Sequence, residues 1–224
     1  MGTSETVLTR KRYDRQARLY DLMETPWEVM VNSRLRKRLW AQVGEGALLE
    51  VGVGTGKNLP YHPQGARSVA VDLSPRMLRR AAGRAHRLGR HVDLLLADAQ
   101  RLPFRDGVFD TATATFVFCS VPDPIAGLRE VRRVVRDGGR VHLLEHVRAR
   151  NPVAGRIMDL LNPIWVRLMG ANINRDTVSN VATAGITADA VETRFGIFKL
   201  IRGSVRRPQA ARLAEAAAAM PQEA

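Results

Sequence analysis

Acidic side chains stand at positions where they could hold a charged ligand. Glu50 lies in the apolar run 47–51 and directly precedes a loop in which Gly52, Gly54 and Gly56 alternate with other residues. A carboxylate at this point would repel a pyrophosphate, but it suits a cationic ligand such as one carrying an amino-acid ammonium group and a sulfonium. The glycines would let the backbone turn tightly and approach that ligand closely. The loop alone would equally serve a dinucleotide, a phosphate or a simple tight turn.

Two further acids follow apolar runs in the same way. Asp72 ends the run 68–72, about 20 residues after the loop, where a carboxylate can accept hydrogen bonds from two ribose hydroxyls. Asp98 follows the run 92–97 and could accept a hydrogen bond from an adenine amino group, although a helix N-cap is its simpler role. The loop has neither the dinucleotide-binding glycine pattern nor the ending of a P-loop. Three acids that each accompany an apolar run form a more specific pattern than the loop alone.

On these features the chain resembles the class I S-adenosylmethionine-dependent methyltransferases. The matching stretches are 49–56, 71–78, 97–104, 109–110 and 128–139, which follow the family's order and spacing over residues 45–147. The resemblance implies that S-adenosylmethionine is the methyl donor and cofactor, that S-adenosylhomocysteine is its product, and that no metal is needed.

The resemblance also implies which residues hold the donor. Glu50 and the glycine loop would hold the methionine part, Asp72 the ribose, and Asp98 with Ala99 the adenine edge, while residues 115–117 line the floor near the methyl group. The full donor-binding prediction is Tyr13, Tyr20, Glu50, Gly52, Val53, Gly54, Gly56, Asn58, Leu59, Asp72, Leu73, Met77, Asp98, Ala99, Gln100, Thr115, Phe116 and Val117. Plain packing is the alternative for the two tyrosines, and core packing is the alternative for the leucine and methionine after Asp72.

The elements that must position these residues alternate between strands and helices. Strands are expected at 68–72, 92–97, 108–115 and 140–145, helices at 75–88 and from 122–124 to 136, a short helix from 55–58 that Pro60 cuts short, and a closing hairpin over 188–195 and 196–202. Ser74 should cap the helix 75–88 and Gly89 should stop it. This alternation predicts a doubly wound, Rossmann-like α/β sheet with right-handed crossovers. The family resemblance implies seven strands, the last of them antiparallel.

The ends of the chain read differently from its centre. Helices are expected over 9–24 and 27–43, with Arg34, Arg36, Lys37 and Arg38 on or beside the exposed face of the second. The chain is therefore predicted to divide into N-terminal basic, amphipathic helices that cover the active site (1–44), a methyltransferase domain (45–205) and a flexible alanine-rich tail (206–224).

Residues that act on the acceptor are harder to find, because methyl transfer to a good nucleophile needs little acid–base help. His146 follows the fifth strand and could deprotonate an amine or hydroxyl, with a structural role as the alternative. The predicted catalytic residues are His146, Tyr20 and Glu145, and the predicted substrate-binding residues are Asn174, Arg175 and Trp165. The first two of the latter could meet a phosphate or simply begin an exposed helix. Trp165 belongs to the apolar stretch 152–169, which Asn162 and Pro163 should interrupt.

Composition limits the partners of the chain. The 224 residues carry a formal net charge of +13, which would suit an anionic membrane surface or simply reflect arginine-rich, solvated helices. No zinc-finger or RNA-recognition signature is present, so no nucleic acid is expected. The single cysteine, Cys119, excludes an internal disulfide and should be a buried core thiol. Without a signal peptide or an apolar run that could span a bilayer, a cytoplasmic protein bound peripherally to the inner face of the cell membrane is expected, with a monomer favoured.

The acceptor is suggested only by resemblance within the superfamily. Residues 20–21, 72–78, 102–104 and 195–202 resemble the branch that holds bacterial phosphatidylethanolamine N-methyltransferases and quinone C-methyltransferases. Residues 144–147 and 174–177 are similar to a membrane-associated alkyl-thiol methyltransferase branch. N-methylation of phosphatidylethanolamine is the first hypothesis, and quinone C-methylation or thiol S-methylation is the alternative. A non-catalytic protein of the same fold, binding a membrane or a partner, is the alternative from another class.

Overall fold

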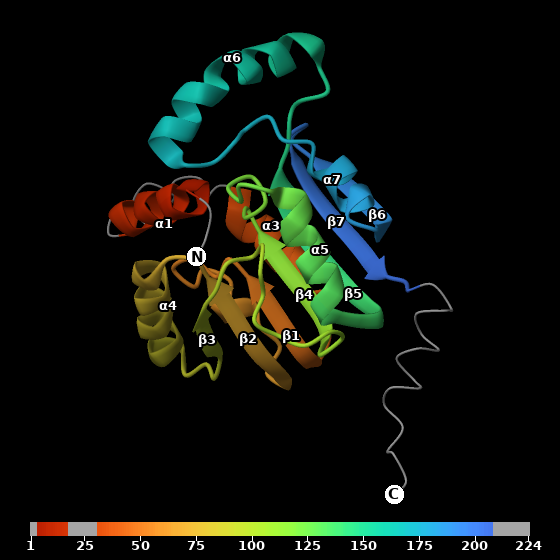
Figure 1. The fold of residues 1–224 in the computed structure, drawn as a ribbon. Helices are drawn as coiled ribbons and strands as arrows, with labels where there is room; N and C mark the ends of the chain where they lie inside the picture. Colours follow the sequence, from red (N-terminus) through yellow and green to blue (C-terminus); the bar gives the residue numbers. More distant parts are fainter. Residues whose placement is uncertain (1–3, 18–30, 208–224) are drawn as a thin grey trace, which may run out of the picture.

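The computed structural model describes residues 4–17 and 31–207. A seven-stranded sheet of order β3-β2-β1-β4-β5-β7-β6 runs through the molecule (Figure 1). The strands are β1 Gly46–Val51, β2 Ala66–Asp72, β3 Asp93–Leu96, β4 Phe109–Thr115, β5 Val135–His146, β6 Ile186–Arg194 and β7 Phe198–Val205. Neighbouring strands from β3 to β5 are parallel, and β7 is antiparallel to both β5 and β6. The predicted doubly wound sheet with an antiparallel last strand is confirmed.

Helices cover both faces of this sheet. In the described residues they are α1 Ser4–Gln16, α3 Ser33–Trp40, α4 Pro75–Leu88, α5 Pro124–Val134, α6 Pro152–Met169 and α7 Thr177–Thr183, and the 3₁₀ helix η2 lies at Leu59–Tyr61. In β1, Leu48 packs with α3, whereas Leu49 and Val51 pack in the cluster that includes residues of α5 and α7. β1 therefore carries apolar side chains to both faces of the sheet, as a buried parallel strand does.

Local sequence signals set several of the element ends. The side chain of Ser74 accepts a hydrogen bond from the Met77 amide, and Gly89 ends α4 in the left-handed conformation at φ 60°. The prediction of a helix over 75–88 is therefore confirmed at both ends. Cys119 is buried, as predicted, and burial raises the pKa of its thiol to about 12.

Four expectations about elements need correction. The short helix expected from residues 55–58 is a turn followed by η2. β5 begins at Val135, before the turn predicted at 137–139, because Val135 already pairs with Phe109 across an irregularity in the register. Pro163 does not interrupt α6, which runs as one helix of 18 residues. α1 begins at Ser4 rather than at residue 9.

Parts of the remaining expectations lie outside the described residues. These are the stretch 18–30, which includes Tyr20 and the ends of both predicted N-terminal helices, and the tail from residue 208 onward. Within residues 4–17 and 31–207, none of the helices combines the length and apolarity needed to cross a membrane.

Candidate functional site

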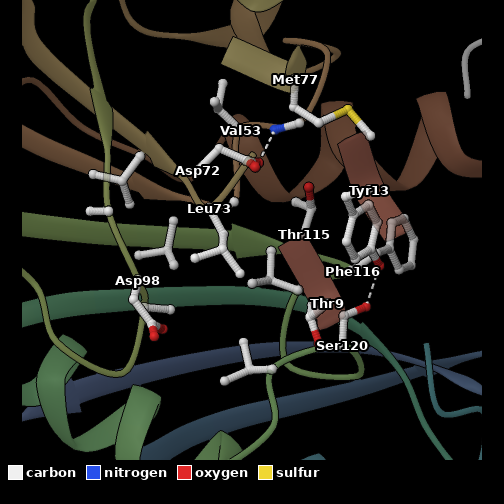
Figure 2. Close-up of a pocket in the computed structure, with 18 of the residues that line it drawn as sticks. Thr9, Tyr13, Val53, Asp72, Leu73, Met77, Asp98, Thr115, Phe116 and Ser120 are labelled. Carbon is white, nitrogen blue, oxygen red and sulfur yellow. Dashed lines mark hydrogen bonds between the residues drawn. The ribbon is translucent and has the colours of Figure 1, made fainter. Parts of the chain in front are cut away.

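A cavity opens where β1, β2 and β4 end, beneath α1 (Figure 2). Counted together with its open mouth, the cavity holds about 890 Å³ of space. This is the edge of an open α/β sheet at which ligands bind. The predicted donor-binding residues that line it are Tyr13, Gly52, Val53, Gly54, Asp72, Leu73, Met77, Asp98, Ala99, Thr115, Phe116 and Val117.

The glycine loop turns at one wall of the cavity, and each glycine has its own reason. Gly52, Gly54 and Gly56 all have positive φ, at 71°, 56° and 83°. A Cβ on Gly52 would lie 2.4 Å from Val117 Cγ2, and one on Gly56 would lie 2.7 Å from Leu59 Cδ1. A Cβ on Gly54 would meet nothing within 4 Å. Gly52 and Gly56 therefore allow close packing, whereas Gly54 leaves open space for a ligand.

This difference predicts that two matched substitutions affect different properties, stability for Gly52 and ligand affinity for Gly54. Gly52→Ala should lower the free energy of unfolding by about 2 kcal/mol or more, because strained backbone and a clash with Val117 act together. Gly54→Ala should fold with a smaller loss but bind S-adenosylhomocysteine more weakly, since its methyl group fills space kept for the ligand. Denaturant titration and calorimetry measure the two effects. Equal affinity losses from equally folded variants would contradict the distinction.

Asp72 is placed to act as an acceptor for hydroxyl groups. Its Oδ2 accepts a hydrogen bond from the Gly54 amide and its Oδ1 one from the Ser74 amide, both at 2.8 Å. Burial raises the pKa of this carboxyl to about 6, although the two amides act in the opposite direction. These amides fix the carboxylate at the cavity wall, where its remaining lone pairs can accept from ribose hydroxyls.

The raised pKa of Asp72 predicts a pH dependence of donor binding. The ionised carboxylate is the stronger acceptor, so affinity should be constant above about pH 7 and should weaken as the pH falls through about 6. Asp72→Ala should lose about 1.5–3 kcal/mol of binding free energy. Asp72→Asn, which cannot titrate, should show no such pH dependence in calorimetry with S-adenosylhomocysteine. An unchanged pH profile in that variant would assign the titration to another group.

Asp98 holds a turn rather than a helix start. Its Oδ1 accepts from the amide of Gln100 at 2.9 Å and from Gln100 Nε2 at 3.0 Å. Gln100 also donates to Thr6 of α1 and accepts from the Asp123 amide. Asp98 therefore lines the cavity as predicted, while Gln100 does not line it and instead orients Asp98.

Glu50 lies behind the cavity rather than in its wall. It is fully buried, its Oε1 accepts from Asn58 Nδ2 at 2.5 Å, and its Oε2 pairs with His62 Nε2 at 2.8 Å. Asn58 Nδ2 also contacts Thr115 Oγ1 at 2.8 Å. Glu50 is not among the described residues that line the cavity, so the prediction that it holds the donor directly stays a prediction. Gly56, Asn58 and Leu59 likewise support the loop from behind.

The position of Arg36 differs most from the one predicted from the sequence. It was expected on or beside the exposed face of its helix, yet it is 5% exposed and lines the cavity. Its Nη1 donates to Asn58 Oδ1 at 2.9 Å and to Thr115 Oγ1 at 2.6 Å, and its guanidinium lies 5.3 Å from the centre of the Phe116 ring. A signal was present, since Arg36, Trp40 and Val43 share one helical face, and the latter two are buried.

The predicted catalytic residues do not meet in the cavity. Tyr20 lies outside the described residues. Glu145 is fully buried, and its Oε1 accepts from the amides of Val117 and Phe118 at 3.0 and 3.1 Å. His146 packs edge-on against Phe198, and burial lowers the pKa of its imidazole. Neither Glu145 nor His146 is among the described residues that line the cavity. Glu145 therefore holds the amides of the segment that follows Phe116, and its predicted catalytic role stays a prediction.

The predicted substrate-binding residues lie apart from the cavity wall as well. Asn174 donates to Asp159 of α6 at 3.0 Å. Burial lowers the pKa of Arg175, the next residue. Trp165 lies on α6 with 44% of its surface exposed. Their predicted contact with a substrate therefore stays a prediction.

Helix α1 forms the roof of the cavity. Thr9 and Tyr13 line it, and the Tyr13 hydroxyl lies 2.5 Å from Ser120 Oγ (Figure 2). Ser74, which follows Asp72 and Leu73 in the chain, donates from its Oγ to Asp14 of α1 at 2.5 Å. Tyr13 thus lies over the pocket, and side-chain hydrogen bonds from Ser120 and Ser74 hold α1 in place.

The residues present fit S-adenosylmethionine. Open space over Gly54 leaves room for a ligand close to the backbone, Asp72 suits the ribose, and Asp98 suits the adenine edge. The buried cation Arg36 suits a carboxylate, which the amino-acid part of the donor carries. Among the described residues, no group of three or more histidine, cysteine or acidic side chains is arranged to hold a metal ion.

Known proteins resemble the chain in the same region. The family model described as "methyltransferase domain" matches residues 49–143. A phosphatidylethanolamine N-methyltransferase of Cereibacter sphaeroides is 37% identical over 129 residues, which are 55% of this chain and 64% of that protein. A human thiol S-methyltransferase is 33% identical over 139 residues, 60% of this chain and 57% of that protein. A ubiquinone/menaquinone biosynthesis C-methyltransferase of Hahella chejuensis is 31% identical over 180 residues, 75% of this chain and 72% of that protein.

The first relatives match over only part of their length, since the chain spans between 57% and 64% of each. Among solved structures, a SAM-dependent methyltransferase of Thermotoga maritima, titled a possible histamine N-methyltransferase, superposes with a TM-score of 0.66 at 22% identity. The superposition covers 88% of this chain and 100% of that one. At this identity the likeness concerns the fold.

Proposed function

The chain belongs to the S-adenosylmethionine-dependent methyltransferases, and from this premise we propose that it methylates a membrane lipid, with the amine of phosphatidylethanolamine as the acceptor. The titratable groups in the cavity wall support an amine as the acceptor. Among the described residues these are Tyr13, Arg36, Lys57, Asp72 and Asp98. We assign both acids to the donor, which leaves no carboxylate or imidazole in this wall to serve as a strong base.

A neutral amine suits such a site because it needs no strong base during the transfer. When bound, the donor supplies an electrophilic methyl group on a sulfonium. The headgroup ammonium would first release a proton to solvent. The neutral amine nitrogen would then form the new N–C bond as the C–S bond of the donor breaks with its electron pair going to sulfur, and the methylated ammonium is the product. The protein's part is to hold both partners in line and to exclude water. The apolar wall formed by Val117, Val121 and Phe116 supports that part.

The test uses purified protein, labelled S-adenosylmethionine and three acceptors presented separately: phosphatidylethanolamine in vesicles, a demethylated quinone precursor in vesicles, and a small alkyl thiol. Label in the phospholipid headgroup is expected. Label only in the quinone or the thiol would identify a different acceptor and leave the assignment as a methyltransferase unchanged. No detectable binding of the donor at millimolar concentration would favour the hypothesis of a non-catalytic protein of the same fold.

Quinone C-methylation is the second candidate, and one observation favours it. The relative named for ubiquinone/menaquinone biosynthesis aligns over 75% of this chain, a longer stretch than the phospholipid enzyme's 55%. Carbon acceptors of this kind need a base to become nucleophilic. A base would therefore have to come from the described residues beyond the cavity wall, such as His146, or from the stretch 18–30.

We also propose that the protein works as a monomer on the inner face of the cell membrane. The exposed basic residues Arg10, Lys11 and Arg15 of α1 support this, because each basic side chain near an anionic surface adds on the order of 1 kcal/mol. Attraction of this kind reaches only about a Debye length and is therefore weakened by salt. Charge reversal at Arg10, Lys11 and Arg12 should accordingly reduce sedimentation with anionic vesicles at low salt.

A further inference from the structure

Helix α6 turns its apolar side away from the protein. Its large apolar residues recur at helical spacing and are exposed to between 44% and 77%: Val153, Ile157, Leu160, Leu161, Ile164, Trp165 and Leu168. Residues at this spacing share one face of a helix. A helix on the surface of a soluble domain normally turns such a face inward. A contiguous exposed apolar face of this kind marks a binding surface.

The inward side of α6 is held by polar contacts instead. Asn162 accepts from the amide of Ile173 at 2.9 Å and donates to Asn172 Oδ1 at 3.1 Å. Near the end of the helix, the Leu168 carbonyl accepts from Gln16 of α1 at 2.6 Å. The apolar side is therefore outward because the opposite side is fixed to the protein, and Figure 1 shows α6 as an outlying helix above the sheet.

The charges around the apolar face of α6 indicate what kind of surface it binds. Between residues 148 and 169 the chain carries Arg148, Arg150, Arg156 and Arg167 but one acid, Asp159, which pairs with Arg148 at 2.8 Å. Arg150, Arg156 and Arg167 are exposed. Apolar side chains flanked by arginines match the acyl and headgroup layers of an anionic bilayer.

We propose that α6 docks the protein on an anionic lipid bilayer by lying in the interface with Leu160, Ile164 and Leu168 among the acyl chains. This deepens the proposed action on a membrane lipid and rests on it. The basic residues of α1 then supply salt-dependent attraction, while α6 supplies the apolar insertion that salt does not screen.

Docking through α6 would bring lipid to the cavity. After α6 the chain continues to Asn172, whose amide and side chain both donate to the Cys119 carbonyl, at 2.9 and 3.1 Å. Ser120, the residue after Cys119, lines the cavity, and its side chain bonds to the Tyr13 hydroxyl of α1. The bilayer-facing helix and the cavity wall are thus linked by direct hydrogen bonds.

The test uses the full chain and places charge on exposed apolar positions. Leu160→Glu, alone and together with Ile164→Glu, changes the α6 face. Leu88→Glu, at the end of α4, is the matched control on another surface. Sedimentation with phosphatidylglycerol-containing vesicles should fall by about tenfold or more in the α6 variants and stay unchanged in the control, because charged side chains do not enter the acyl layer. All variants should keep their melting temperature and their affinity for S-adenosylhomocysteine.

Trp165 offers a second measurement. Its fluorescence should shift to shorter wavelength on vesicle binding and be quenched by brominated acyl chains, and Trp165→Phe should abolish both changes while the protein still sediments. At high salt the wild-type protein should sediment less but retain the Trp165 shift in the bound fraction.

Three outcomes would overturn the proposal. They are unchanged sedimentation of the α6 variants, a wild-type protein that ignores vesicles, and a wild-type dimer that Leu160→Glu turns into a monomer without any change in vesicle binding. The last outcome would make the face an interface between two copies. Vesicle binding through α6 without label in phosphatidylethanolamine would leave the docking intact and remove only the proposed acceptor.

Discussion

Arg36→Met should weaken binding of S-adenosylhomocysteine by about 30-fold or more, since losing one partner of a buried, hydrogen-bonded charge pair costs about 2–5 kcal/mol. Arg36 is a buried cation in the cavity wall and donates hydrogen bonds to Asn58 and Thr115. We expect its guanidinium to meet the carboxylate of the donor's amino-acid part. Calorimetry with purified variants measures the loss.

A truncated ligand separates this role from simple support of the fold. Methylthioadenosine carries the adenine, ribose and sulfur but no amino-acid carboxylate, so Arg36→Met should bind it nearly as well as wild type. Asp72→Ala should instead weaken both ligands, because the ribose is present in each. Arg36→Lys keeps the charge and should recover part of the affinity. Equal losses for both ligands in Arg36→Met would show that Arg36 acts through the shape of the site.

The predictable part of the molecule is the part set by short-range signals. The alternation of apolar runs with helices predicted the doubly wound sheet, and Ser74 and Gly89 marked both ends of α4. Asp72 and Asp98 were placed correctly because the end of a strand fixes the edge of the sheet at which its last residues lie. These features depend only on residues close together in the chain.

The features that were missed depend on residues far apart. Glu50 lies buried behind the cavity wall, where Asn58 and His62 bind its two oxygens, and the glycine pattern alone does not show this placement. Arg36 reads as a solvated arginine because Thr115, its partner, is 79 positions away. The outward apolar face of α6 has the same periodicity as a buried helix, so periodicity could not show which way it points. Tertiary contacts decided each case.

The role of Glu145 shows most clearly how such contacts change an assignment. Predicted as catalytic, it lies fully buried behind the segment 116–118 and accepts from the amides of Val117 and Phe118. Phe116 begins this segment in the left-handed region at φ 59°, a conformation that costs of order 1–3 kcal/mol for such a residue. Glu145 therefore accepts from the two amides that follow this strained residue of the cavity wall.

Glu145→Ala should lower the free energy of unfolding by about 3–5 kcal/mol, because two buried amides and the nearby Arg175 lose their acceptor and countercharge. Glu145→Gln keeps an oxygen for the amides and should lose far less. Denaturant titration at pH 7 measures both. If Glu145 were catalytic, the glutamine variant would fold normally and lose methyl transfer; as a positioning residue, it should keep most of its activity.

A pH series tests the same assignment independently. Burial raises the pKa of Glu145 from 4.5 to about 7, so between these values the folded protein holds a proton that the unfolded chain has released. The contribution of this group to stability must then fall as the pH rises from 4.5 to 7. Glu145→Gln lacks this penalty and should gain up to about 3 kcal/mol relative to wild type between pH 5 and pH 8. A stability difference that does not change with pH would mean that the pKa of Glu145 is the same in the folded and the unfolded chain, which would contradict the effect of burial argued here.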